Sequence, residues 1–475
     1  MSELDVLVVG GGISGLAIAH SLSRAGLHVE LWEGEARVGG KIRTRVKQGY
    51  RLESAASMVV NFRSEVDRFL RISGLEHSTC VRSTHATRYL ADAERLREVP
   101  SGLIEMVRSP LFSRSGKLRL LAEPLVPRGC APGESVAEFV ARRLGKEFLD
   151  KAFEPYVAGP LASDIEQAEA RAILPKLTAL EARYGSLVVG ALLGKVLRGG
   201  RAMRPKVFSF ANGMETLVET LGRAGAFRVR NNLRVSRVQA VRGGWLTSGT
   251  SAATPSTVFS RQVVLSTPAD VSARLMADVH DELARHLHAI EYASVNVVHT
   301  GFRRSDVAHP LRGSGFLVPR GCGYPANGCL WMSQLFPDRA PGDEVLLSSY
   351  VGGARNPDAA TWSTARTLDA VMGMLRPLLG VRKTPELLHI ERHNRALPLY
   401  HGAYTQRLAA IDRCLVTLPG LHLEANYKGG VSVRDRILRG EQAAERILKQ
   451  AEHASRAPSC TPAGMPGIAA AAGMR

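Results

Sequence analysis

The hydrophobic pattern of the first 33 residues predicts a strand, a helix and a second strand in close succession. Residues 5–9 (DVLVV) form a nearly continuous apolar run, which is typical of a strand buried on both faces of a parallel sheet. The helical pattern LAIAHSLSRAG follows, and Gly26 lies where a helix C-cap is expected. A second apolar run over 28–32 ends at Glu33. This order predicts a parallel βαβ unit at the N-terminus.

The rest of the chain divides into stretches of different hydrophobic period. We expect helices over 60–78 and 435–451 and through most of 90–200, strands over 206–268 and from Leu421, and alternating helices and strands over 270–395. A glycine turn, Gly429 and Gly430, precedes the last helix. The tail beyond that helix is rich in alanine, proline and glycine and has no period, which predicts disorder.

Composition and charge exclude several classes of protein. The chain has 475 residues, enough for two or three domains, and no run reaches the roughly 18 apolar residues that a membrane span needs. A net charge of +18 favours anionic partners, but no zinc finger, RNP-type aromatic cluster or basic block indicates nucleic acid. Six scattered cysteines without a CxxC pair indicate neither a disulfide framework nor a metal site. Because the N-terminus lacks a signal-peptide pattern, we expect a cytoplasmic protein.

Three glycines after the first strand have the G-x-G-x-x-G spacing of dinucleotide-binding sites. Gly10 permits a tight turn, Gly12 lets a pyrophosphate approach the backbone, and Gly15 lets the helix pack closely on the strands. The N-terminus of the helix presents unpaired N–H groups to the phosphates, and Glu33 can accept hydrogen bonds from a ribose hydroxyl. Strand, glycines, helix, strand and acid occur in the required order, so the sequence predicts a dinucleotide site.

One stretch of the helical region, 101–126, mixes apolar residues with basic ones. The basic residues are Arg108, Arg114, Lys117 and Arg119. Such a stretch can lie on an anionic membrane surface, at the inner face of the cell membrane. It can equally form a pair of core helices whose arginine side chains extend to solvent. Both interpretations are open at this point.

The residues after Glu33 favour FAD over NAD. The segment GEARVGGKIRT, with Gly39, Gly40 and Lys41, resembles the second glycine motif of the flavin amine oxidases, whose extra glycines lie close to FAD. Up to the tail, the chain also resembles the oxygen-dependent, FAD-containing protoporphyrinogen oxidases, which share that fold. The matching segments include RYL (88–90), GESVAEFVARRLG, FEPYVAG, FSFANGMETL, GFLVPR, LFPDRAP, SYVGG, ALPLY and NYKGGVSVRDRI.

This resemblance implies a fold. We expect an α/β protein with a discontinuous Rossmann-type FAD-binding domain, an α/β substrate domain and a mostly helical insertion. The predicted segments are 1–87, 201–269 and 396–452 for the FAD-binding domain, 88–200 for the helical, membrane-associating insertion, 270–395 for the substrate domain and 453–475 for the disordered tail. The oligomeric state is open, and a homodimer is one alternative.

The resemblance also implies a reaction. A porphyrinogen, either protoporphyrinogen IX or the related coproporphyrinogen III, is converted to the porphyrin in heme biosynthesis, with O2 as acceptor and H2O2 as product. In that family hydride passes from a ring carbon to the flavin, and the cofactor carries the chemistry. We therefore expect no catalytic triad and no metal.

Site residues follow from the same resemblance, motif by motif. For FAD they are Gly10, Gly11, Gly12, Ile13, Ser14, Gly15, Glu33, Lys41, Ala55, Ala56, Ser57, Met58, Val235 near the adenine, and Val431, Ser432 and Val433 near the isoalloxazine. For the tetrapyrrole substrate they are Leu317, Leu330 and Tyr350 around the ring, Gly159 in a backbone turn, and Arg88 as the arginine that binds a carboxylate.

The chain departs from the family pattern near the predicted site. The loop 55–58 reads Ala-Ala-Ser-Met where the family usually has glycine-proline-asparagine-serine, so Ser57 replaces the asparagine proposed to assist the substrate amine. Residues 163–165 read Ser-Asp-Ile instead of glycine-aspartate-proline, and Tyr350 stands where phenylalanine is common. Two rival functions follow: a same-fold oxidase or desaturase acting on another amine or pyrrole metabolite, and a tetrapyrrole carrier with structural FAD.

Overall fold

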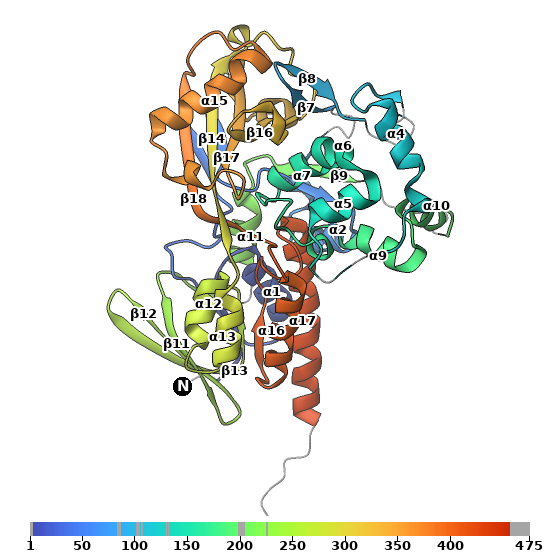
Figure 1. Cartoon of the computed structure of the whole chain (residues 1–475). Helices are drawn as coiled ribbons and strands as arrows, with labels where there is room; N and C mark the ends of the chain where they lie inside the picture. The colour runs from blue at the N-terminus through green and yellow to red at the C-terminus, as the bar shows by residue number, and fades with distance from the viewer. Residues whose placement is uncertain are drawn as a thin grey trace, which may run out of the picture.

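Two seven-stranded sheets and a separate helical region organise the molecule (Figure 1). The computed structural model describes residues 3–82, 87–100, 105, 108–129, 131, 133–197, 205–224 and 227–456. In Figure 1 the second sheet lies at the top, the first sheet with its helices at the bottom, and the helical region to one side. The α/β class predicted from the sequence is confirmed.

The first sheet binds the N-terminal βαβ unit into a larger layer. It contains, in spatial order, β10 (Arg228–Arg230), β2 (Val29–Trp32), β1 (Leu4–Val9), β13 (Thr254–Leu265), β12 (Gly244–Ser251) and β11 (Arg234–Val241), and β19 (Leu421–Leu423) pairs with β13. Strands β10, β2, β1, β13 and β19 run parallel. In β1, Val6 and Val8 face one core while Leu7 and Val9 face the other, which explains the continuous apolar run.

Helices cover both faces of this sheet. One face packs against α1 (Ile13–Arg24), α2 (Ser64–Ile72), α11 (Glu215–Ala224) and α17 (Val433–Arg456), and the other against α12 (Ala269–Met276), α13 (Asp281–His288) and α16 (Tyr404–Val416). Apart from Ala269, helices α12 and α13 lie within 270–395, the segment predicted for the substrate domain, yet their apolar faces belong to the nucleotide-binding core. Helix α17 continues to Arg456, so the first residues of the predicted disordered tail are helical, and 457–475 lie outside the described residues.

The second sheet contains strands from two distant parts of the chain. Its spatial order is β18 (Leu387–Pro398), β14 (Tyr292–Arg303), β17 (Glu344–Gly352), β16 (Ala326–Trp331), β15 (Gly315–Leu317), β7 (Arg88–Asp92) and β8 (Arg95–Glu98). Helix α15 (Thr364–Leu379) packs on one face of this sheet. Strands β7 and β8 lie at the start of the stretch predicted to be mostly helical; β7 joins the sheet by parallel pairing with β15.

Two small sheets connect the large ones. Strand β3 (Thr44–Lys47) pairs with β4 (Tyr50–Glu53), and β9 (Lys206–Phe210) lies between β5 (Val59–Asn61) and β6 (Thr79–Arg82). The helix predicted over 60–78 is therefore shorter. Its first residues belong to β5, α2 ends at Ile72, and the short 3-10 helix η1 (Glu76–Ser78) precedes β6. Helix α11 was not expected within 206–268, which otherwise forms strands as predicted.

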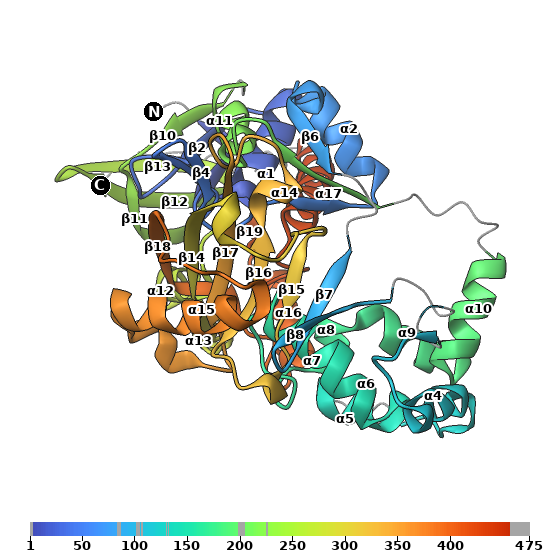
Figure 2. The same cartoon turned by 90° about the horizontal axis from the view of Figure 1, so that it is seen from above.

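The helical region extends from the sheets as a separate body (Figure 2). It contains α4 (Arg114–Leu121), η2 (Glu123–Leu125), α5 (Val136–Leu144), α6 (Lys146–Phe148), η3 (Leu149–Phe153), α7 (Glu154–Ala158), α8 (Ala170–Ile173), α9 (Pro175–Tyr184) and α10 (Leu187–Leu197). Leu111, Phe112 and Leu120 belong to its apolar core. Among the described residues, no helix combines the length and the apolar character needed to traverse a bilayer.

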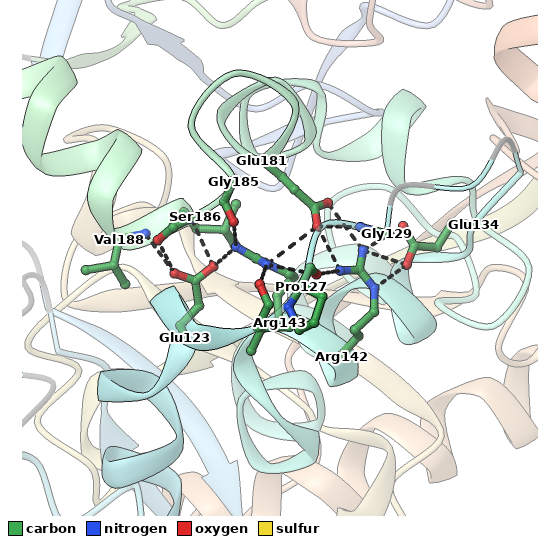
Figure 3. A network of polar contacts seen from close by, with 12 residues as sticks. Glu123, Pro127, Gly129, Glu134, Arg142, Arg143, Glu181, Gly185, Ser186 and Val188 are labelled. Carbon is green, nitrogen blue, oxygen red and sulfur yellow. Dashed lines mark hydrogen bonds and ion pairs between the residues drawn. The ribbon is translucent and has the colours of Figure 1, made fainter.

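A network of buried charges fixes this region (Figure 3). Arg143 of α5 and Glu123 of η2 form an ion pair with both side chains fully buried. Arg143 also lies 3.6 Å from the buried carboxylate of Glu181 on α9, which Arg142 binds at 2.7 Å. Arg142 reaches Glu134 as well, at 2.8 Å. The alternating charges join η2, α5 and α9.

Glu123 connects the same network to α10. Its carboxylate accepts hydrogen bonds from the N–H groups of Leu187 at 2.9 Å and Val188 at 3.2 Å, and from the Ser186 hydroxyl. A carboxylate at this position satisfies the free N–H groups of the helix and favours its positive dipole end. Burial alone would raise the pKa of Glu123, but these hydrogen bonds and Arg143 lower it. The position of α10 therefore depends on an ionised Glu123.

Candidate functional site

The glycine loop after β1 has the geometry of a phosphate cradle. Gly10 has φ +102°, and a Cβ there would lie 2.8 Å from the Ser266 carbonyl oxygen. A Cβ on Gly15 would lie 2.0 Å from the Gly10 carbonyl oxygen, so α1 approaches β1 as closely as the motif requires. Among the described residues, no heavy atom lies within 4 Å of the Cβ position of Gly12. Space for a pyrophosphate is thus left beside Gly12, at the N-terminus of α1.

Glu33 lies at the end of β2, where a ribose is expected. Its carboxylate accepts the N–H of Gly11 at 2.7 Å and the N–H of Glu35 at 2.9 Å. The Glu33 carbonyl accepts the N–H of Leu233 at 2.8 Å, which holds the start of β11 alongside. Val235 is two residues further along β11. The structure therefore brings Glu33 and Val235 together, as the assignment of both to the adenosine end of FAD requires.

The second glycine motif contacts the first. The N–H of Gly39 donates to the Gly11 carbonyl at 2.7 Å, and Gly39 and Gly40 both have positive φ. A Cβ on Gly40 would meet the Cα of Gly12 at 3.6 Å. The two motifs consequently form one surface around the open space at Gly12.

Lys41 adds a cation to this surface. Burial lowers the pKa of its ammonium, while Asp270 opposes that effect. Lys41 makes no hydrogen bond or ion pair with any residue that the structure describes. A hollow of about 480 Å³ opens beside it, lined by Lys41, Pro268, Arg392, His393, Asn394 and Arg395. A partly buried ammonium that no described residue binds by a hydrogen bond or ion pair, beside a phosphate cradle, fits an anionic cofactor such as FAD.

The C-terminal motif packs against the same cores as the N-terminal unit. Val433 begins α17 and lies in the core shared with α1, while Val431 packs against the core on the other face of the sheet. The Ser432 hydroxyl accepts the N–H of Asp435 at 3.2 Å and so caps the helix. The helix predicted over 435–451 therefore begins two residues earlier, at Val433, directly after this cap.

The loop 55–58 lies between the two large sheets. Ala56 packs with Ile13 against the core that contains Val433. Met58 packs with Leu330 in another cluster, which includes residues of the second large sheet. The loop therefore joins the FAD motifs to the substrate face, and a flavin ring at 431–433 would lie next to that face.

The residues predicted to hold the substrate lie on one face of the second sheet. Leu317 pairs with Gly328 of β16, and Gly328 pairs with Tyr350 of β17. In the neighbouring row, Gly315 lies between Arg88 and Leu330. The opposite face, which α15 covers, carries residues such as Phe316, Cys329 and Val351. The structure thus brings together Arg88, Leu317, Leu330 and Tyr350.

Three side chains on this face are more exposed than their position inside the sheet would suggest. Leu317, Leu330 and Tyr350 are partly exposed, although strands flank each of them on both sides. A Cβ on Gly159, at the C-terminus of α7, would lie 2.6 Å from Leu317 and 2.9 Å from the Pro155 carbonyl oxygen. The helical region therefore closes over Leu317 at a point where only glycine fits, while Leu317, Leu330 and Tyr350 stay partly exposed.

Comparison with known proteins identifies the family. The family model of flavin containing amine oxidoreductases matches residues 13–448. The chain belongs to this family. It is an FAD-dependent oxidoreductase, as the sequence predicted, and the resemblance to protoporphyrinogen oxidases is confirmed.

Relatives match this oxidoreductase over nearly its whole length. It is 30% identical to the mitochondrial protoporphyrinogen oxidase of Nicotiana tabacum, over 96% of each chain. It is 25% identical to the coproporphyrinogen III oxidase of Bacillus subtilis, over 93% of this chain and 97% of the relative. A crystal structure from Exiguobacterium sp. 255-15 has a TM-score of 0.78 at 24% identity and covers 95% of this chain and 100% of that one. That structure shows the fold alone.

Arg88 of the oxidoreductase is exposed at the start of β7. Its carbonyl accepts the N–H of Val99 at 2.8 Å, which fixes the backbone. Its guanidinium forms no ion pair with any residue in the described ranges. Its positive charge lowers the pKa of a neighbouring cation, Arg82. A role as half of a surface ion pair with a described residue therefore finds no support, and the side chain keeps its five donors for a ligand.

A buried ion pair supports the 55–58 loop, and the sequence analysis did not find it. Glu53 precedes the loop and lies 3.2 Å from Arg339, with both side chains almost fully buried. The Glu53 carboxylate also accepts the N–H of Met214 at 3.0 Å and the Thr44 hydroxyl at 2.8 Å. Burial raises the pKa of Glu53, and Arg339 opposes this. The signal was available, because Arg339 is the arginine of LFPDRAP.

A histidine on the substrate face was also missed. His299 of β14 is buried, and its Nδ1 lies 2.8 Å from the Ser348 hydroxyl oxygen. Its ring stacks on His389, which contacts Glu391 at 2.9 Å. Burial lowers the pKa of His299 to about 4. Neutral imidazole therefore lies next to the apolar part of the face at ordinary pH.

Proposed function

We propose that this oxidoreductase converts a porphyrinogen, protoporphyrinogen IX or coproporphyrinogen III, to the porphyrin in heme biosynthesis, with O2 as acceptor and H2O2 as product. One observation carries the proposal. The partly exposed apolar residues Leu317 and Leu330 lie in neighbouring rows of one face beside the flavin loop, and Arg88 borders them as a cation without a described ion-pair partner. The names of the tobacco and Bacillus relatives support the same substrate class.

The shape of the face suits the chemistry of such a substrate. A porphyrinogen is a large, mostly apolar macrocycle with propionate groups at one edge. Leu317 and Leu330 can hold the ring, but apolar contacts do not fix its rotation in its own plane. The fork of Arg88 can bind a carboxylate in bidentate fashion and so fixes that rotation. Bound FAD supplies the acceptor for two electrons in each of three cycles.

A substrate panel tests the proposal. Purified holoenzyme is mixed anaerobically with each porphyrinogen, and flavin absorbance is followed; porphyrin fluorescence and H2O2 are then measured in air. We expect flavin bleaching and porphyrin formation with at least one of the two. Bleaching by another amine or pyrrole alone would favour the same-fold rival, and no bleaching by any compound would favour the carrier. Reoxidation by a quinone but not by O2 would refute the acceptor.

We also propose that the helical region binds the surface of an anionic membrane. Large apolar side chains are exposed on α4, η2 and α10, at the outer end of the region in Figures 1 and 2. These side chains, here named the apolar patch, are Leu118, Leu121, Leu125, Val189, Leu192 and Leu193. Arg114, Lys117 and Arg119 lie on the same helix as Leu118. Apolar residues beside cations are the pattern of interfacial binding.

The stretch 101–126 has features of both interpretations of the sequence, the core helices and the membrane surface. Leu111, Phe112 and Leu120 are core residues, whereas Leu118, Leu121 and Leu125 are exposed. Residues 101–104, 106 and 107 lie outside the described residues. Helix α10 lies within the predicted membrane-associating insertion, 88–200, but outside the stretch 101–126 that the sequence analysis singled out.

Flotation with vesicles tests the membrane proposal. We expect binding to vesicles that contain anionic lipid, weaker binding at high salt, and little binding to neutral vesicles. Leu121→Gln with Leu125→Gln should reduce binding several-fold. Val416→Gln is the matched control, since Val416 is 83% exposed on α16, outside the patch. Equal flotation of all variants would refute a role for the apolar patch.

A further inference from the structure

Two hydroxyl groups face each other where the flavin loop meets the substrate sheet. The Ser57 side chain belongs to the loop 55–58, and the Tyr350 side chain belongs to β17. Their oxygen atoms lie 3.5 Å apart. Ser57 is buried, and Tyr350 is partly exposed on the face that carries Leu317 and Leu330. The pair therefore adds a polar point beside the apolar side chains of Leu317 and Leu330.

Both hydroxyls retain capacity for a further hydrogen bond. A hydroxyl–hydroxyl bond is usually 2.7–2.8 Å long, so a separation of 3.5 Å is a weak contact. Within the described part of the chain, neither hydroxyl makes any other hydrogen bond. Tyr404 shows the contrast, because its hydroxyl donates to the Tyr427 carbonyl at 2.6 Å. A poorly bonded hydroxyl in a largely buried place is costly unless another group joins it.

A ligand on the substrate face can be that group. The substrate face and the loop converge at Tyr350, so a ring held against Leu317 and Leu330 passes beside both hydroxyls. Burial raises the pKa of the Tyr350 phenol, which keeps it protonated and able to accept as well as donate. In a reduced macrocycle every pyrrole nitrogen carries a hydrogen and is a donor. Hydroxyl oxygens are suitable acceptors for such donors.

We propose that Ser57 and Tyr350 are positioning residues that together accept a pyrrole N–H of the substrate. The inference rests on the proposed function, and it names the side chains that contact the interior of the macrocycle. Arg88 binds the edge of the substrate, whereas the hydroxyl pair binds its interior next to the flavin loop. Two separated contacts hold the oxidisable carbon in one place, which a single contact would not do.

Kinetics of three variants test the pair. Tyr350→Phe and Ser57→Ala each remove one hydroxyl, and the double variant removes both. We expect each single variant to lower kcat for the porphyrinogen about tenfold, as the loss of one hydrogen bond in the reacting complex implies. The double variant should lose little more than the worse single variant, because both hydroxyls serve the same N–H. Ser57→Thr, which keeps a hydroxyl, should recover most of the rate.

Stability and FAD content separate positioning from structure. Tyr350→Phe should melt at the parent temperature and retain its flavin, because the lost hydroxyl had no close partner. Tyr404→Phe is the matched control and should melt at a lower temperature, because it loses a 2.6 Å hydrogen bond. If the parent oxidises a porphyrinogen and both single variants stay within twofold of it, the positioning role is refuted. A parent that oxidises neither porphyrinogen would instead refute the proposed function.

Discussion

Loss of the Arg143 side chain should destabilise the helical region and leave the stability of the rest of the molecule unchanged. Arg143→Met removes a fully buried cation that pairs with the equally buried Glu123. It also removes the donors to two carbonyl groups, those of Val126 at 2.9 Å and Gly185 at 2.7 Å. The methionine fills a similar volume, so the change is mainly one of charge and hydrogen bonding.

The magnitude follows from the partners that remain. Breaking a buried ion pair by removing one member costs about 3–5 kcal/mol, because the other charge stays buried without compensation. Glu123 keeps the N–H groups of Leu187 and Val188 and the dipole of α10, which stabilise its charge. We therefore expect the lower part of that range, about 3 kcal/mol. Replacing Glu123 as well should recover part of the loss, since a well-packed apolar pair is often as stable as an ion pair.

Hydrogen exchange measures this effect locally. The chain has separate cores, so a single unfolding free energy is not a good measure. Protection of the amides of α5 and α10 should fall roughly a hundredfold in Arg143→Met, whereas protection of α1 and α17 should not change. FAD content should also stay at the parent value, because the network lies in the helical region (Figure 3).

Two results would contradict the reasoning. If amides of α10 kept parent protection in Arg143→Met, the ion pair would not hold that helix. If the double variant Arg143→Met with Glu123→Leu lost at least as much stability as the two single variants lose together, the two residues would not act as a pair.

Three further predictions concern the cofactor, the substrate and pH. Gly12→Val should yield colourless protein, because its side chain occupies the space left for the pyrophosphate; full flavin absorbance would refute the cradle. Arg88→Ala should lower kcat/KM roughly ten- to a hundredfold with FAD content unchanged, and Arg88→Lys should recover part; a change within twofold would reject the carboxylate anchor. Since His299 has a pKa of about 4 when folded and about 6.5 when unfolded, the unfolded state binds the extra proton between these values. Stability should therefore fall by about 2 kcal/mol from pH 7 to pH 5 on account of His299, and hydrogen-exchange protection of β14 should show a smaller fall in His299→Asn.

The N-terminal unit was predictable because its signals are local. The residues of β1 alternate between two cores, and the glycine loop sits directly between β1 and α1. Each conclusion about Gly10, Gly12 and Gly15 depended on neighbours within a few positions. The same holds for Gly26, which follows α1 with φ +90° as a helix C-cap glycine should. Such features need no knowledge of the rest of the fold.

Strands β7 and β8 were not predictable in that way. Their sequences, RYLAD and RLRE, are short and charged, and neither alternates clearly. They become strands because β7 pairs with β15, whose residues lie more than two hundred positions later. The pairing of Glu53 with Arg339 is more distant still along the chain, so the segment LFPDRAP could be noted while its contact with Glu53 could not. Non-local pairing decides these features, and one sequence does not display it.

The rows of the substrate sheet explain how a fold shared with other oxidoreductases can select one substrate. Fold likeness alone does not fix a reaction, so under the proposed function the side chains on this face provide the selectivity. One row places Arg88 at the edge, Gly315 and Leu330 in the middle, and Ser348 with His299 beyond them. Adjacent strands lie about 4.8 Å apart, so Arg88 and Leu330 are separated by about 10 Å along the row. A molecule that meets the guanidinium, the apolar centre and the Tyr350 hydroxyl at once must be broad, apolar and acidic at one edge, and small amines do not meet all three conditions.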